Sequence, residues 1–227
     1  MPFFRRSPPT DAMASVGGFV LCSDAIKSEE NRYHDSMLPT MNFIERMLFF
    51  LEWLRRIGRR KGFGIQSPSA YQYVTDVLCQ RLPYHLYADL QKLFPKVKGR
   101  QRKVYRLFFR LANDRQAEKT FVSPLLSDEG REYILAGNRR TTISKQMKGC
   151  GFIVVSATEM DAHNWNFILM DEVESDAVLV VTDICRGKDA WQAVKTCERV
   201  KMTFDCYDVG VALFGLTLHQ QHYSLNL

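Results

Sequence analysis

The chain has 227 residues, of which 46% are hydrophobic and 25% are charged. This length and composition exclude a low-complexity or fibrous protein and allow one α/β domain with a smaller appendage. The longest apolar-looking run, residues 47–54, is short and interrupted by Glu52, so we expect no membrane-spanning segment. The six cysteines form no C-x-x-C pair, which excludes the usual zinc spacing and favours reduced thiols in a cytoplasmic protein.

The charge is distributed unevenly along the chain. Residues 1–115 hold 20 Lys and Arg against 10 Asp and Glu, a balance of +10. Residues 116–227 hold 11 against 15, a balance of −4. This asymmetry predicts either an anionic partner or electrostatic attraction between the two parts of the chain.

The first half of the sequence predicts a loose segment followed by helices. Residues 1–40 are rich in Ser, Pro, Gly and Asp and lack a sustained period, so we expect a disordered or loosely attached segment. Residues 41–115 form a basic helical region, in which Ser67 can cap a helix that has Pro68 at its first position. We expect helices at 42–60, from Ser67 onward, at about 84–94 and at about 101–113.

The second half predicts an α/β domain at 116–227. Near-continuous Val, Ile and Leu runs favour strands that are covered on both faces, as in a parallel sheet, and the last strands are expected to be antiparallel. The expected strands are 119–122, 140–144, 151–157, 166–171 and 176–183, followed by closing strands at 201–207, 209–215 and 222–227. Helices are expected after the turn at 123–127 and over 187–199.

The segment FGIQSPSAY, residues 63–71, and the runs RLFFRLAN, NFILMD, VLVVTDI and FDCYDVGVALF follow one another in an informative order. In this succession the chain resembles class I S-adenosylmethionine-dependent methyltransferases of the predicted O-methyltransferase type, over about residues 43–227. Such proteins carry a Gly-Ile-His-Ser-Pro-Phe-type sequence, which Gly64, Ile65, Ser67 and Pro68 match. The resemblance implies a Rossmann-like methyltransferase sheet, here trimmed, that is preceded by N-terminal helices.

The residues that would hold the cofactor depart from this resemblance. In the family the first strand ends in an acid and leads into a Gly-x-Gly-x-Gly-like turn, because side chains would block the ligand's approach to the backbone. The equivalent positions here are Ser123, then Leu125, Ser127 and Glu129, and Ser144 stands where a second acid would hold the ribose. The resemblance therefore leaves only positional equivalents, and we expect no standard S-adenosylmethionine binding.

The middle of the chain is also shorter than the resemblance implies. Only residues 145–150 separate two expected strands, whereas a parallel crossover usually needs a dozen or more residues. These strands either form an antiparallel hairpin or have lost their connecting helix. The connection at 158–165 is short as well, so the wall that normally covers the adenine is largely missing.

Two acids remain as candidates for chemistry. Asp171 and Asp183 each end an expected strand, at the sheet edge where α/β proteins bind ligands. They are candidate catalytic residues and candidate ligands for a divalent cation near a methyl acceptor. We favour the alternative that they only terminate their strands, since acids are common there without a ligand.

A basic group follows the first expected helix and consists of Arg55, Arg56, Arg59, Arg60 and Lys61. Such a group can bind nucleic acid or an anionic membrane surface. We favour the simpler interpretation that it is a solvated helix end, which balances the acidic second half.

Three functions are compatible with these observations. The first, which we favour, is a methyltransferase-fold protein without standard cofactor binding that acts as a non-catalytic interaction or scaffold protein, with a protein partner or a second copy. The second is an active S-adenosylmethionine-dependent O-methyltransferase with an unconventional cofactor site and Asp171 and Asp183 at the acceptor end. The third is an anion-binding protein that uses its basic helices.

Overall fold

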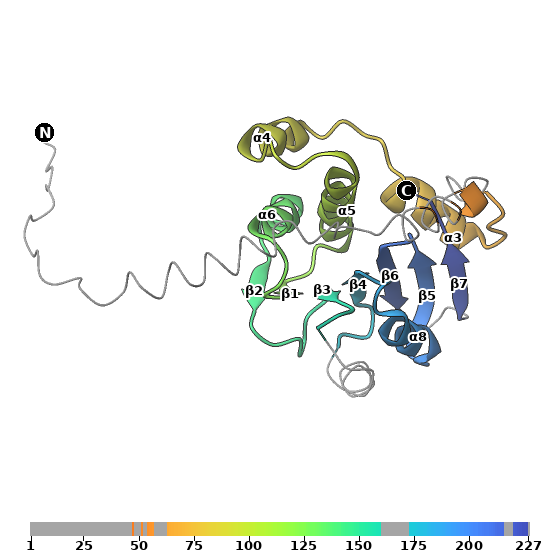
Figure 1. Cartoon of the computed structure of the whole chain (residues 1–227). Coiled ribbons are helices and arrows are strands. Elements are labelled where there is room, and N and C mark those ends of the chain that lie inside the picture. The colour runs from red at the N-terminus through yellow and green to blue at the C-terminus, as the bar shows by residue number, and fades with distance from the viewer. Residues whose placement is uncertain are drawn as a thin grey trace, which may run out of the picture. The chain divides into compact units, whose positions relative to one another are not determined.

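The computed structural model describes residues 47, 51, 54–56, 63–159, 173–215 and 220–226 (Figure 1). The chain divides into two parts by its contacts, and one of them is Thr40–Leu227, the second unit. All of the described residues belong to the second unit, and the fold below is the fold of that unit. The expected loose segment at 1–40 lies outside the described residues.

The helix that starts at Pro68 begins where the sequence places its cap. The Ser67 hydroxyl accepts a hydrogen bond from the backbone N–H of Ala70, and Pro68 occupies the first helical position. Met47, Leu51 and residues 54–56 are helical, whereas the rest of the expected helix at 42–60 lies outside the described residues. The helices that follow are α3 (Pro68–Tyr73), the π-helix η2 (Val74–Leu78), α4 (His85–Leu93) and α5 (Gly99–Arg115).

Helix α5 is the central helix of this region. Its buried residues are Val104, Tyr105, Leu107, Phe108, Phe109, Leu111 and Ala112, whereas its basic residues are half-buried or exposed. It packs against η2 and against α6 (Asp128–Gly137). The close approach of α5 and α6 requires a glycine, because a Cβ atom on Gly137 would collide with the backbone carbonyl oxygen of Phe109.

The sheet has seven strands in the order β2-β1-β3-β4-β6-β5-β7. Their bounds are β1 Lys119–Val122, β2 Thr142–Ser144, β3 Phe152–Ser156, β4 Val178–Thr182, β5 Val200–Asp205, β6 Val209–Phe214 and β7 Gln221–Ser224. Strands β2, β1, β3 and β4 run parallel, and β6 runs antiparallel to both of its neighbours. The expected α/β fold, a mostly parallel Rossmann-like sheet with a reversal near its C-terminal end, is confirmed.

The short connection at 145–150 does not make a hairpin. Strands β2 and β3 lie on opposite sides of β1 and both run parallel to it, as the pairing of Thr120 with Ile143 and with Phe152 shows. The hairpin alternative is therefore wrong, and residues 145–150 contain no connecting helix. The expected strand at 166–171 lies outside the described residues, and β3 pairs directly with β4.

One face of the sheet forms a core with helix α8 (Lys188–Thr196). Trp191 and Val194 of α8 pack into a cluster with strand residues such as Ile153 and Leu179. Figure 1 shows α8 on one side of the sheet and α5 and α6 on the other. Both β3 and β4 are buried along their whole length, which explains their uninterrupted apolar sequences.

The charge asymmetry of the sequence is partly neutralised within the fold. Three arginines from the basic half form ion pairs with acids of the other half: Arg56 with Asp205 at 2.7 Å, Arg100 with Asp208, and Arg115 with Glu174 at 2.9 Å and Asp176 at 2.8 Å. The Arg100 guanidinium also donates to the backbone carbonyl of Cys206 at 2.7 Å. The attraction predicted between the two parts of the chain is therefore present.

We predict that Gly137→Ala destabilises the protein, although alanine normally favours a helix over glycine. The new methyl group must push apart the α5 and α6 backbones, and overpacking of this kind costs about 1–3 kcal/mol. Urea unfolding measures the change. The matched control is Gly215→Ala, since no heavy atom lies within 4 Å of the added Cβ there, and an equal effect of both substitutions would contradict the prediction.

Candidate functional site

The expected ligand edge is formed by the carboxyl ends of three neighbouring parallel strands. Val122 of β1 pairs with Val154 of β3, and Ser156 of β3 pairs with Thr182 of β4, so these strands end side by side. Ser123 and Asp183 directly follow β1 and β4 and stand at this edge with Ser156. In open α/β sheets, ligands bind outside the carboxyl ends of the strands.

A carboxylate that the sequence analysis did not single out joins two of these strand ends. One oxygen of Glu159 accepts a hydrogen bond from the Ser123 hydroxyl. The other oxygen accepts the backbone N–H of Ser156 at 2.9 Å. The turn after β3 directs Glu159 back toward the strands, because its own N–H donates to the Ser156 carbonyl at 3.2 Å. Glu159 thus links the ends of β1 and β3 above the sheet.

Ser123 replaces the expected acid at the end of β1 and is 2% exposed. Besides donating to Glu159, its hydroxyl accepts the backbone N–H of Leu125 at 3.0 Å. Its carbonyl accepts the N–H of Leu126 at 3.1 Å. The first N–H groups of the turn are therefore engaged by Ser123 itself.

Ser127 closes the other end of the turn. It is the N-cap of α6, where its hydroxyl accepts the N–H of Gly130 at 3.3 Å and shares a 2.6 Å hydrogen bond with the Tyr105 hydroxyl. Leu126 is buried beneath the helix, whereas Leu125 is 44% exposed. Leu126 is thus the leucine that fills space in this turn.

Ser144, the equivalent of the second acid, uses its hydroxyl locally. The hydroxyl donates to the Gln146 carbonyl at 2.6 Å and accepts the Gln146 N–H at 3.1 Å. These bonds shape the turn after β2. The three serines that the sequence resemblance aligns with cofactor positions, Ser123, Ser127 and Ser144, are all hydrogen-bonded within the fold.

Asp183 stands at the end of β4, where the sequence places it. Its backbone is left-handed, with φ 58°, and one carboxylate oxygen accepts the hydroxyls of Ser156 and Thr182, both at 3.2 Å. Asp171 lies outside the described residues. Within the ranges that the structure describes, no three His, Cys, Asp or Glu side chains gather as metal ligands would.

Cys185 follows Asp183 and is the exposed one of the described cysteines. Desolvation of its sulfur, together with the nearby carboxylates of Asp208 and Asp183, raises the pKa of its thiol. A raised pKa disfavours the thiolate, which is the nucleophilic form of cysteine.

Of the basic group at residues 55–61, the structure describes only Arg55, which is exposed, and Arg56. The Arg56 guanidinium donates to Asp205 and lies over the Tyr207 ring, 5.5 Å from its centroid. Arg59, Arg60 and Lys61 lie outside the described residues. No helix among the described residues combines the length and apolar character that crossing a bilayer requires.

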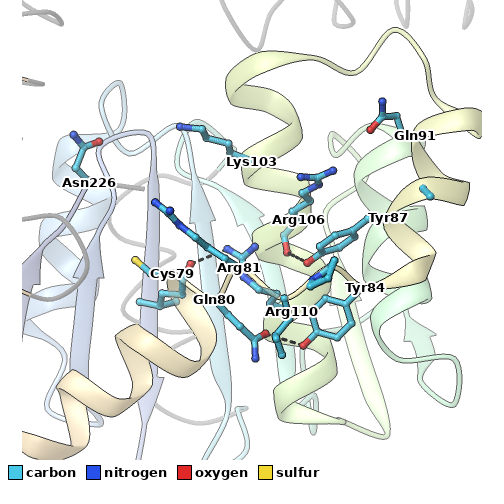
Figure 2. Close-up of a pocket in the computed structure, with 14 residues that line it drawn as sticks. Cys79, Gln80, Arg81, Tyr84, Tyr87, Gln91, Lys103, Arg106, Arg110 and Asn226 are labelled. Carbon is cyan, nitrogen blue, oxygen red and sulfur yellow. Dashed lines mark hydrogen bonds between the residues drawn. The ribbon is translucent and has the colours of Figure 1, made fainter.

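A concave feature lies away from the sheet edge. It is a cavity of about 940 Å³ between the segment from Leu78 to Ala88, helix α5 and Asn226 (Figure 2). Its wall carries Arg81, Lys103, Arg106 and Arg110, and none of the 14 residues that line it is acidic. The sequence analysis missed this cavity, although Lys103, Arg106 and Arg110 recur at helical spacing and so share one face of α5.

The comparisons with known proteins are limited. No family model matches the chain, and no curated protein matches it. Among solved structures, the crystal structure of a methyltransferase from Geobacter sulfurreducens is 9% identical in sequence, with a TM-score of 0.38 over 60% of this chain and 91% of that chain. A likeness at this level carries no conclusion about activity, and the fold assignment rests on the observed strand order.

We predict that Glu159→Ala lowers the free energy of unfolding by about 1–3 kcal/mol, because a buried serine hydroxyl and a strand-end N–H both lose their charged acceptor. Chemical denaturation measures the loss. Glu132→Ala, which removes an exposed acid on α6, serves as the control and should change stability by less than about 0.5 kcal/mol. Similar values for both variants would show that the Glu159 bridge contributes nothing.

Proposed function

We propose that this chain is a non-catalytic protein on a methyltransferase-like α/β fold, which has lost standard S-adenosylmethionine binding and acts as an interaction or scaffold protein. The observation that supports this proposal best is the Glu159 bridge between the ends of β1 and β3. It places a carboxylate of the chain itself at the edge where a ligand is expected.

The hydrogen-bonding groups of this edge are already engaged. Both Glu159 oxygens accept bonds from strand ends, and the Ser123 hydroxyl both donates and accepts. A ligand that used these groups would first have to displace the existing bonds. Each buried polar group left without a partner costs about 1–3 kcal/mol, so displacement disfavours binding.

The N-terminus of α6 is also poorly suited to an anionic ligand group. Ser127 caps the helix, and Asp128 and Glu129 lie in its first turn. Carboxylates at this position interact favourably with the helix dipole and repel a further negative charge. Two neighbouring parts of the expected ligand edge thus favour the same proposal.

The complete hydrophobic core supports a role as an interaction protein. The buried strands β3 and β4 and the packing of α8 form a complete core. The fold therefore needs no adenosyl cofactor for its stability in this proposal. A stable fold whose strand-end polar groups are already hydrogen-bonded within the chain is suited to binding a protein partner or a second copy. Asp183 as an acceptor-end residue gains no further support, because its described contacts are the hydroxyls of Ser156 and Thr182.

We predict that calorimetric titration of the full chain with S-adenosylmethionine or S-adenosylhomocysteine gives no saturable heat up to about 1 mM, a concentration that would detect any binding stronger than about −4 kcal/mol. We expect no binding because Glu159 and Ser123 already use their hydrogen-bonding groups within the chain. An active class I methyltransferase titrated under the same conditions provides the positive control.

Saturable micromolar binding would contradict the proposal, provided that it occurs at this edge. Asp183→Asn identifies the place, because it changes the charge of the edge with little change in shape. Micromolar binding that Asp183→Asn weakens would support the enzyme alternative.

A further inference from the structure

The cavity of Figure 2 brings together parts of the chain that are distant in sequence. Its wall consists of the segment from Leu78 to Ala88, Gln91 of α4, the basic face of α5, and Asn226 after β7. It contains none of the residues of the sheet edge around Ser123 and Asp183. Ligand binding in this cavity would therefore be independent of the proposed loss of cofactor binding at the sheet edge.

The described residues of the wall include four cations and no acid. Arg110 has a structural role, because its guanidinium donates to the carbonyls of Val77 at 2.8 Å and Leu78 at 2.7 Å and so ends η2. The three other cations are Arg81, Lys103 and Arg106. Like charges that surround one cavity repel each other, and a bound anion converts this repulsion into attraction.

Two buried donors on the wall lack acceptors in the described structure. Asn226 is 8% exposed, and its side-chain amide nitrogen makes no hydrogen bond. The Nε atom of Arg106 is also buried without a partner. Because buried polar groups are nearly always hydrogen-bonded, two unused donors on one wall indicate a ligand that is rich in acceptor oxygens.

Aromatic residues hold Arg106 in place. Its guanidinium lies over the Tyr87 ring, 4.7 Å from the centroid. The Tyr87 ring meets Phe109 and Tyr84 edge to face, with centroids 5.0 Å and 5.3 Å apart. Burial raises the pKa of Tyr87, although Arg110 and Arg106 oppose the shift, so the ring is a neutral platform. A guanidinium that is fixed in advance loses less entropy when it binds an anion.

We propose that this cavity binds a small phosphate-bearing ligand, whose phosphate oxygens contact Arg81, Lys103 and Arg106 and accept a hydrogen bond from the Asn226 amide. Arg and Lys together are the usual partners of phosphate groups. A volume of about 940 Å³ exceeds what a lone phosphate fills and accommodates a molecule of nucleotide size. The concave wall, built from several segments, favours a small molecule over a polymer that would lie along a basic surface.

Calorimetry on the full chain tests this proposal with two probes, inorganic pyrophosphate and ATP, at about 150 mM salt, where long-range charge effects are largely screened. We expect saturable binding of at least one probe. Arg81→Ala/Lys103→Ala should weaken it at least about tenfold, because both cations contact the phosphate. The matched control is Arg139→Ala/Arg140→Ala, which removes the same charge from exposed positions outside the cavity and should change affinity less than about twofold.

Asn226→Asp provides a second variant with nearly unchanged shape. It places a carboxylate among the cations, so it should abolish binding of both probes while the thermal melting temperature stays the same or rises. The proposal is overturned if neither probe binds, and also if the two double variants lose equal affinity. Association only with anionic lipid vesicles or single-stranded nucleic acid, tested in parallel, would also overturn it in favour of a surface-binding function.

Discussion

The carboxylate of Glu159 defines the carboxyl edge of this sheet, because it accepts hydrogen bonds from the ends of two neighbouring parallel strands at once. In open α/β sheets this edge is where ligands bind, since the strand ends and helix N-termini there present unpaired backbone groups. Here the chain satisfies these groups itself. Ser123 engages the N–H of Leu125, and Ser127 engages that of Gly130, so the turn forms a closed hydrogen-bonded unit.

The sheet is short on the side of β2. The connection from β2 to β3 lacks a helix, and β2 is the outermost described strand and only three residues long. The buried strands β3 and β4 and the α8 cluster are nevertheless complete. The basic cavity lies on another part of the molecule, where α5 contributes to both the apolar core and the charged wall. Different residues of α5 therefore contribute to the apolar core and to the wall of the cavity.

The sequence predicts what local patterns determine. Ser67 and Pro68 mark the start of α3, uninterrupted Val, Ile and Leu runs mark β3 and β4, and Asp183 stands at the end of its strand as expected. The direction of β2 relative to β3 could not be predicted, because connection length alone allows a hairpin or a direct crossover.

Features that depend on contacts between distant residues could not be predicted either. Glu159 is one acid in a short polar connection, and no pattern indicates that it reaches Ser123, 36 positions away in the chain. The cavity joins Arg81 and Asn226, and nothing in either neighbourhood relates one residue to the other. The charge asymmetry predicted an attraction within the chain, but the residues that pair, such as Arg100 with Asp208, follow from how α5 lies over the β5–β6 turn.

The most direct test of this account is the electron density of a crystal of the full chain equilibrated with S-adenosylhomocysteine. The account predicts that Glu159 still bridges Ser123 and the Ser156 N–H, with no adenosyl density over the turn at 123–127. Density for the ligand over that turn, with the Glu159 side chain displaced from both strand ends, would contradict it.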